Sequence, residues 1–171
     1  HATHMTARET ARLAASGAVA GLCPFTEASL GDGIFNGADY AAAGGAFGVG
    51  SDSNILVTLS GELRQLEYAQ RLRDRARVVL ADQRSAGTFI FDNALSGGAQ
   101  ALGRASGAIA PGLWADLLAL DMDHPSLTGL AGDTAVDAFV FATGEGAVRD
   151  VWSAGRHMVR QGRHVARGRI V

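Results

Sequence analysis

Up to Leu102 the chain alternates between helix-forming segments and short apolar runs, and this alternation restricts the fold more than any other feature. Thr6–Ser16 is typical of a helix that opens with a capping box, because Thr6 is followed three residues later by Glu9. Ala18–Cys23 is a short apolar run of the kind that forms a buried strand. Such alternation produces parallel sheets with right-handed crossovers, so we predict an α/β fold.

The same alternation continues beyond the first strand. A second apolar run begins at Phe47, and the longest helical pattern of the chain follows it. Between and after these segments we expect a loop at Phe25–Gly37, a short helix at Ala38–Ala43, a long helix at Leu59–Ala81 and a helical region at Thr88–Leu102 that is interrupted by Gly97 and Gly98.

Beyond Gly103 the pattern changes to short, β-rich apolar runs separated by turns. The residues Ser153–Arg156 are typical of a tight hairpin, and Arg160–Arg163 are typical of a turn. We therefore expect a second, β-type module, with strands at Leu117–Asp121, Ala138–Phe141, Val148–Trp152 and Arg156–Val159.

Composition and charge exclude several classes of partner. The 171 residues are 47% hydrophobic, which is enough for a sizeable core, and the net charge of −2 gives no reason to expect nucleic acid or a membrane surface as a partner. The single cysteine, Cys23, lies in an apolar run, so we interpret it as a buried core thiol in a cytoplasmic protein. Because the chain starts at His1 and not at Met, we expect a fragment of a longer polypeptide.

The stretch FGVGSDSN, residues 47–54, places a carboxylate where an apolar strand opens into a loop. In α/β proteins ligands bind outside the carboxyl ends of parallel strands, so Asp52 is a candidate functional residue. The alternative is a loop or N-cap carboxylate that satisfies stray backbone N–H groups. The stretch by itself favours the cap.

Further segments of the sequence favour a functional role for Asp52 over a cap. HATHMT, GLCPFTEASLGDGIF, GVGSDSN, a long Leu- and Arg-rich helix, SGAIAPGLWADLLALD and RDVWSAGRHMVRQGRH follow one another in this order. Together they resemble the deaminase branch of the amidohydrolase superfamily. Within that branch, TEASLGDGIF, GSDSN and ELRQLEYAQRLRDRAR are most similar to the deiminases that act on N-formimino-L-glutamate in bacterial histidine breakdown. The resemblance spans essentially the whole chain but only the later part of those enzymes.

The resemblance implies a fold and an activity. Residues 1–105 would be the last part of a distorted (β/α)₈ TIM barrel, and residues 106–171 would be strands of a small β-sandwich. The implied enzyme is a hydrolase that converts N-formimino-L-glutamate and water to N-formyl-L-glutamate and ammonia. Its substrate is a small molecule, it works as a homodimer, and its site requires the upstream half of the same polypeptide.

The resemblance also implies roles for two residues. Asp52 corresponds to an aspartate that contacts a single divalent metal ion, with zinc expected and iron possible, and that acts as base and then as proton donor. His1 corresponds to a histidine that lies beside the reacting water without being a core ligand. A carboxylate that accepts and returns a proton, and an imidazole that orients water, suit hydrolysis.

Two other readings stay open. One is another deaminase or a chlorohydrolase of the same branch, acting on a nucleobase or a triazine. The other is a non-catalytic binding or scaffold fragment, if the chain is complete as given.

Other polar residues we interpret as structural. His4 would pack or lie in a loop, and Glu27 and Asp32 would lie away from the metal, since acidic groups repel a dicarboxylate substrate. His124, His157 and His164 would be surface residues, and the helix Arg64, Arg71, Arg73, Arg75 and Arg77 would form a solvated face with Glu62, Glu67 and Asp74.

Overall fold

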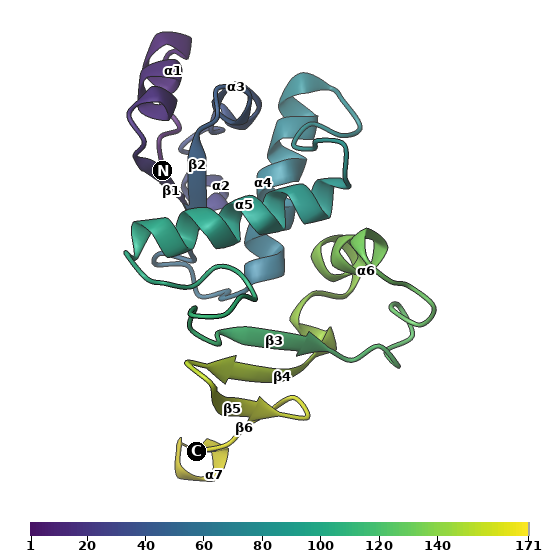
Figure 1. Cartoon of the computed structure of the whole chain (residues 1–171). Helices are drawn as coiled ribbons and strands as arrows, with labels where there is room; N and C mark the ends of the chain where they lie inside the picture. Colours follow the sequence, from purple (N-terminus) through teal and green to yellow (C-terminus); the bar gives the residue numbers. More distant parts are fainter. Residues whose placement is uncertain (171) are drawn as a thin grey trace.

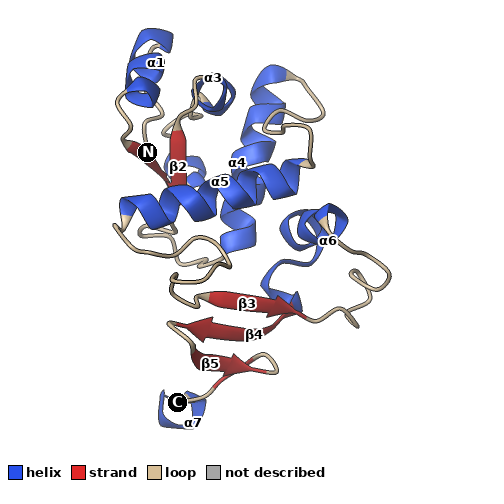
Figure 2. Ribbon diagram, viewed as in Figure 1, coloured by secondary structure: helices blue, strands red, loops and turns tan. Residues whose placement is uncertain are grey.

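The computed structural model describes residues 1–170 and has two parts, a helical part around two parallel strands and an antiparallel sheet (Figures 1 and 2). Among these residues no helix is long and apolar enough to cross a bilayer. The elements are α1 (Ala7–Ala15), β1 (Val19–Leu22), α2 (Pro24–Leu30), α3 (Gly37–Ala42), β2 (Ala46–Val49), α4 (Leu59–Asp74), α5 (Ala86–Ala101), β3 (Leu117–Leu120), α6 (Asp133–Ala138), a π-helix (Phe139–Thr143), a 3₁₀-helix (Gly144–Ala147), β4 (Val148–Ser153), β5 (Arg156–Arg160), β6 (Arg163–His164) and α7 (Arg167–Ile170).

The first part contains the predicted parallel strand pair. β1 and β2 run parallel, with Val19 opposite Ala46 and Leu22 opposite Val49. The Gly50 N–H donates to the Leu22 carbonyl at 2.9 Å and extends the pairing past the end of the strands. The carboxyl ends of both strands therefore meet at one edge, which is the edge expected to carry chemistry.

Helix α1 begins as the sequence predicts. The Thr6 hydroxyl accepts from the Glu9 N–H at 3.3 Å, and the Glu9 carboxylate accepts from the Thr6 N–H at 2.8 Å. This capping box satisfies backbone N–H groups that have no partner inside the helix.

The segment after β1 differs from the expected loop. Residues Pro24–Leu30 form α2, which begins with Pro24 in its first turn and ends at Gly31 in a left-handed conformation (φ 72°). Proline is favoured in the first turn because its missing N–H would have no helical partner there. The prediction of a loop from Phe25 to Gly37 is therefore wrong for its first six residues.

Helix α5 runs without interruption through Gly97 and Gly98, which corrects the expected break. A Cβ atom at Gly97 would lie 2.0 Å from the Phe47 carbonyl oxygen, so the helix backbone sits directly on β2. Glycine allows this approach because it has no side chain. The pair is therefore a packing feature and not a helix breaker.

Helix α4 ends at Asp74, seven residues earlier than the expected end at Ala81. The fully buried Glu67 carboxylate accepts from the backbone N–H groups of Val79 at 3.0 Å and Leu80 at 2.8 Å. These contacts hold the following segment alongside the helix, and Arg75 makes the turn in a left-handed conformation (φ 53°). A long-range contact thus overrides the local helical pattern.

The core of the first part lies between the strand pair and the helices. Tyr40 is fully buried, and its hydroxyl lies 3.0 Å from both the Ala18 and the Ala46 carbonyl oxygens, at the start of the two strands. The largest fully buried apolar side chains around it are Leu22, Phe35, Phe47, Leu63 and Ile90.

The second part contains one four-stranded antiparallel sheet in the order β3-β4-β5-β6. The predicted hairpin is present, with Ala154 (φ 51°) and Gly155 (φ 76°) at its tip. Two positive φ angles in a two-residue loop match the right-handed twist of the flanking strands. Within residues 1–170 this sheet has no second sheet packed on it, so the sandwich and its boundary near residue 105 stay predictions.

The run Ala138–Phe141 was expected to be a strand, but it is helical. It continues α6 into the π-helix, and Phe139 and Val140 are buried in the core of the first part. The Arg64 side chain donates to the Val140 carbonyl at 2.8 Å, which fixes this segment on α4. A short apolar run does not distinguish a strand from a buried helical segment.

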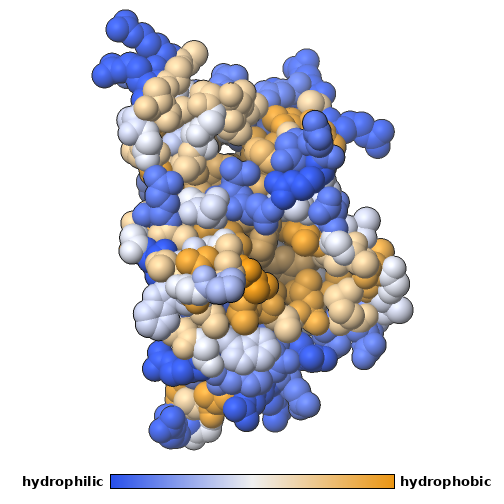
Figure 3. Space-filling view, viewed as in Figure 1, coloured by the Kyte–Doolittle hydropathy of each residue, from blue (hydrophilic) through white to orange (hydrophobic). Residues whose placement is uncertain are grey.

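An apolar hollow of about 730 Å³ separates α5 from the sheet (Figure 3). It is lined mainly by side chains of α5, the loop after it and the sheet, among them Phe91, Leu95, Ile109, Leu117 and Trp152. Apolar side chains gathered in one exposed hollow mark a place where another surface packs.

Candidate active site

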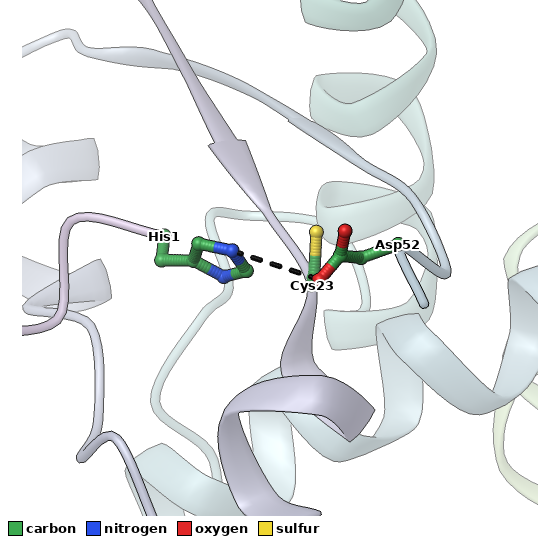
Figure 4. Close-up of side chains that lie close together, drawn as sticks. All are labelled: His1, Cys23 and Asp52. Carbon is green, nitrogen blue, oxygen red and sulfur yellow. Dashed lines mark ion pairs between the residues drawn. The ribbon is translucent and has the colours of Figure 1, made fainter. Parts of the chain in front are cut away.

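The carboxyl edge of the strand pair gathers side chains that are distant in sequence (Figure 4). Cys23 directly follows β1, and Asp52 lies in the turn after β2. The His1 main-chain nitrogen donates to the Gly21 carbonyl at 2.8 Å, so His1 lies beside β1. Three chain segments thus converge at one point.

His1 and Asp52 face each other across this edge. The His1 Nε2 and the Asp52 Oδ2 atoms are 3.9 Å apart, and the two side chains are 44% and 43% exposed. Asp52 adopts a left-handed conformation (φ 49°), and the Thr26 hydroxyl donates to the Ser51 carbonyl at 3.2 Å. The structure therefore brings the two sequence-predicted residues together, while their catalytic and metal-binding roles stay predictions.

Glu27 is a member of this cluster that sequence reasoning placed elsewhere. It lies on α2, is only 5% exposed, and its Oε1 atom is 3.3 Å from the His1 Nδ1. The same oxygen accepts from the Cys23 N–H at 2.8 Å. Burial raises the pKa of Glu27, against the opposing effect of that N–H. The expectation that Glu27 stays away from the site is wrong, because the unpredicted helix α2 turns it inward.

Cys23 lines the site and is half-buried, which corrects its assignment to the core. Burial raises the pKa of its thiol, and the Asp52 and Glu27 carboxylates raise it further. A thiol in such surroundings stays protonated near neutral pH, and only the thiolate is a good nucleophile or metal ligand. Cys23 therefore contributes shape to the site and not charge.

Glu62 is a second buried acid behind the cluster. It is 2% exposed, its Oε2 accepts from the Phe25 N–H at 2.9 Å, and its Oε1 has no hydrogen-bond partner among the described residues. Burial raises its pKa, the Phe25 N–H opposes this effect, and the nearby Glu27 adds to it. The interpretation of Glu62 and Glu67 as part of a solvated helix face is therefore wrong.

This burial predicts how stability depends on pH. An acid with a raised pKa in the folded state stabilises the fold fully below its unfolded pKa, here the usual glutamate value of 4.5, and this contribution is lost as pH rises through the folded pKa. Glu62→Gln stays neutral and keeps an oxygen for Phe25. We expect its melting temperature to exceed that of the unmodified enzyme at pH 7, with the difference shrinking toward pH 4.5.

Glu9 provides the opposite control. It is exposed, and its hydrogen bonds to Thr6 lower its pKa. Its contribution is therefore present above its unfolded pKa and is lost as pH falls. Glu9→Gln should melt at a lower temperature than the unmodified enzyme at pH 7. A Glu62→Gln variant that also melts lower at pH 7 would contradict the interpretation of Glu62 as a destabilising charge.

The side-chain donor atoms at the strand edge can supply part of the coordination shell of one divalent metal ion. One donor atom each from His1, Cys23 and Asp52 lie within 4.8 Å of one another, close enough to surround a single ion. Imidazole nitrogen, carboxylate oxygen and thiolate sulfur are all common zinc ligands. A metal-binding role for Asp52 stays a prediction.

The remaining histidines lie outside the cluster. His157 is not a free surface residue, because its Nε2 lies 2.9 Å from Asp150 and its ring stacks on Trp152. His4, His124 and His164 are not part of the donor group at the strand edge, and the Nδ1 atoms of His124 and His164 accept from backbone N–H groups two residues on. These contacts give the histidines of the sheet and its loops structural roles.

Comparisons with known proteins give similarities along most of the chain. The matching family model is described as the amidohydrolase family and covers residues 1–158. Formimidoylglutamate deiminase from Pseudomonas aeruginosa is 52% identical over 171 residues, which is 99% of this chain and 38% of that protein. The chain therefore spans well under half the length of the curated relative that it matches.

Solved structures show the same fold. An amidohydrolase from Brucella melitensis is 49% identical, with a TM-score of 0.90, over 99% of this chain and 37% of that one. An adenosine deaminase from Xanthomonas campestris with bound zinc is 24% identical, with a TM-score of 0.84, over 96% of this chain and 37% of that one. At that identity the second similarity shows the fold alone.

Proposed function

This chain belongs to the amidohydrolase family, and from that premise we propose that it is the C-terminal part of a formimidoylglutamate deiminase. The 52% identity to a curated deiminase across nearly the whole chain carries the proposal. The pairing of His1 with Asp52 at the strand edge supports it, because hydrolysis needs a proton acceptor beside a group that orients water.

The proposed reaction adds water across a carbon–nitrogen double bond. Water attacks the formimino carbon of N-formimino-L-glutamate, a new carbon–oxygen bond forms, and the carbon–nitrogen bond to the terminal nitrogen breaks. The products are N-formyl-L-glutamate and ammonia. Asp52 accepts the first proton that the water loses and delivers it to the terminal nitrogen, and His1 holds the water by a hydrogen bond. The second proton leaves the new hydroxyl group as the carbonyl forms, and Asp52 passes it to the same nitrogen, which departs as ammonia.

A divalent metal ion belongs to this proposal, with zinc expected because a structural neighbour contains it. Fe²⁺ accepts the same imidazole and carboxylate ligands. When bound, such an ion makes water acidic enough to react near neutral pH. Asp52 would hold it together with ligands from the upstream part of the polypeptide.

The proposal also covers the upstream part of the polypeptide, the oligomeric state and the location of the enzyme. The upstream half of the same polypeptide would complete the barrel and cover the apolar hollow between α5 and the sheet. The proposed enzyme is a cytoplasmic homodimer. Size-exclusion chromatography of the full-length enzyme tests its oligomeric state.

Ammonia release tests the function directly. We expect the full-length enzyme to release ammonia from N-formimino-L-glutamate, to lose this activity on treatment with a chelator, and to regain it with Zn²⁺ or Fe²⁺. Adenosine, guanine and a chlorotriazine serve as comparison substrates. Faster turnover of one of these would favour another deaminase or chlorohydrolase, and no turnover of any would favour a non-catalytic role.

A further inference from the structure

The His1 ring lies between two carboxylates that come from different elements. Its Nδ1 is 3.3 Å from Glu27 Oε1, and its Nε2 is 3.9 Å from Asp52 Oδ2. Glu27 belongs to α2 and is buried, whereas Asp52 follows β2 and is 43% exposed. The two ring nitrogens therefore have different surroundings, one enclosed and one open.

The Glu27 oxygen that faces the ring is held in an accepting role. The Cys23 N–H donates to the same Oε1 atom at 2.8 Å, and this N–H belongs to the residue that precedes α2. A backbone N–H only donates, so Oε1 accepts there, and a proton on this carboxyl group is favoured on the other oxygen because a carbonyl oxygen accepts more strongly than a hydroxyl oxygen. The remaining lone pair of Oε1 suits an Nδ1–H donor, whether or not Glu27 is ionised.

Two hydrogen bonds hold the start of α2, the helix that carries Glu27. Glu62 accepts from the Phe25 N–H at 2.9 Å, and Pro24 between the two anchored residues has no N–H of its own. The Glu27 side chain is therefore held beside His1, because turning away would leave the half-buried Cys23 N–H without its partner.

We propose that Glu27 is a positioning residue that holds His1 as the Nδ1–H tautomer, so that Nε2 faces Asp52 as a hydrogen-bond acceptor. In a neutral imidazole one nitrogen donates and the other accepts, and the bond made by one nitrogen sets the role of the other. The catalytic meaning of this assignment rests on the proposed function.

The tautomer determines what fits between His1 and Asp52. Nε2 and the Asp52 carboxylate are then two acceptors 3.9 Å apart, which attract a donor or a cation between them. A water molecule has two O–H donors and can satisfy both groups. His1 thus accepts a hydrogen bond from the reacting water and orients its lone pair, while Asp52 takes the proton.

Nitrogen NMR of the full-length enzyme, labelled with ¹⁵N in its histidines, tests the tautomer without any substrate. The His1 signals are identified by their loss in His1→Asn. In the unmodified enzyme we expect Nδ1 to carry a proton and Nε2 to be unprotonated. A bare Nδ1 beside a protonated Nε2 would overturn the proposal, and this measurement needs no variant at Glu27.

Variants at Glu27 separate positioning from simple capping of α2. Glu27→Leu removes the acceptor, so we expect His1 to change to the Nε2–H tautomer and kcat to fall by about 10–100-fold with little change in KM. Glu27→Gln keeps a neutral acceptor and should recover part of both properties, because charge-assisted hydrogen bonds are roughly twice as strong as neutral ones.

Glu62→Gln is the matched control, since it removes a buried carboxylate from the same helix end without touching His1. It should leave the His1 tautomer unchanged. If Glu27→Leu folds and keeps the Nδ1–H tautomer, Glu27 is only a cap and the proposal fails. If the tautomer changes but the enzyme releases no ammonia from N-formimino-L-glutamate, the positioning role stands and the proposed function fails.

Discussion

Asp52→Asn in the full-length enzyme is expected to lower the rate of ammonia release by at least about 10²–10⁴-fold, which is the usual value of general acid–base assistance. The substitution keeps the shape and one oxygen of the side chain but removes its charge and its capacity to accept a proton. Asp52 has a φ of 49°, and asparagine tolerates this left-handed conformation as well as aspartate does. The melting temperature should therefore change little.

The measurement combines turnover, melting temperature and metal content of the same preparation. Loss of turnover with metal retained indicates a proton-transfer role, and loss of turnover together with metal indicates a ligand role. If Asp52 only caps the loop, asparagine replaces it well and both activity and stability survive. Turnover close to that of the unmodified enzyme would remove the catalytic assignment.

Gly97→Ala is expected to give the largest loss of stability among glycine-to-alanine substitutions in α5. The added Cβ would lie 2.0 Å from the Phe47 carbonyl oxygen and 2.6 Å from its carbon, and both are backbone atoms of β2. A backbone contact cannot be relieved by turning a side chain, so α5 must move away from the strand. Overpacking of this kind costs about 1–3 kcal/mol, or more where the backbone cannot yield.

The neighbouring glycine is the control. A Cβ at Gly98 would meet no atom within 4 Å, and the residue lies within the same helix. Alanine is favoured over glycine inside helices by about 0.5–1 kcal/mol, so Gly98→Ala should melt at the same temperature or higher. Equal melting temperatures for the two variants would show that α5 does not depend on close contact with β2.

The movement of α5 caused by Gly97→Ala should also displace residues of the candidate active site. β2 leads into the turn that carries Asp52, and α5 packs on β2. Catalytic geometry is sensitive to shifts of about 1 Å. We therefore expect folded Gly97→Ala enzyme to lose turnover as well, whereas Gly98→Ala keeps it.

Local patterns in the sequence predict much of this fold. The capping box at Thr6 and Glu9, the two apolar strands and the Ser153–Arg156 hairpin are all present, because each depends on residues that are neighbours in the chain. Residue order also places Asp52 at a strand end. The family membership follows from the same information, since motifs keep their order and spacing along the chain.

Tertiary contacts decide the features that local patterns predict wrongly. Gly97 resembles a helix breaker until its contact with Phe47 is known, and Ala138–Phe141 resembles a strand until Val140 is seen against Arg64. In both cases the partner is distant in the sequence. No local period or propensity carries information about such a partner.

The residues of the candidate site also fall into those that the sequence predicts and those that only the tertiary structure places. From the sequence, Asp52 is a candidate because it follows an apolar strand and matches the family resemblance, whereas His1 is a candidate through the resemblance alone. Only the tertiary structure places Glu27 against His1, because α2 turns that side chain inward and the Cys23 N–H holds it there. The physical reason is that burial and hydrogen bonding of a polar side chain depend on packing between segments, which the residue type by itself leaves open.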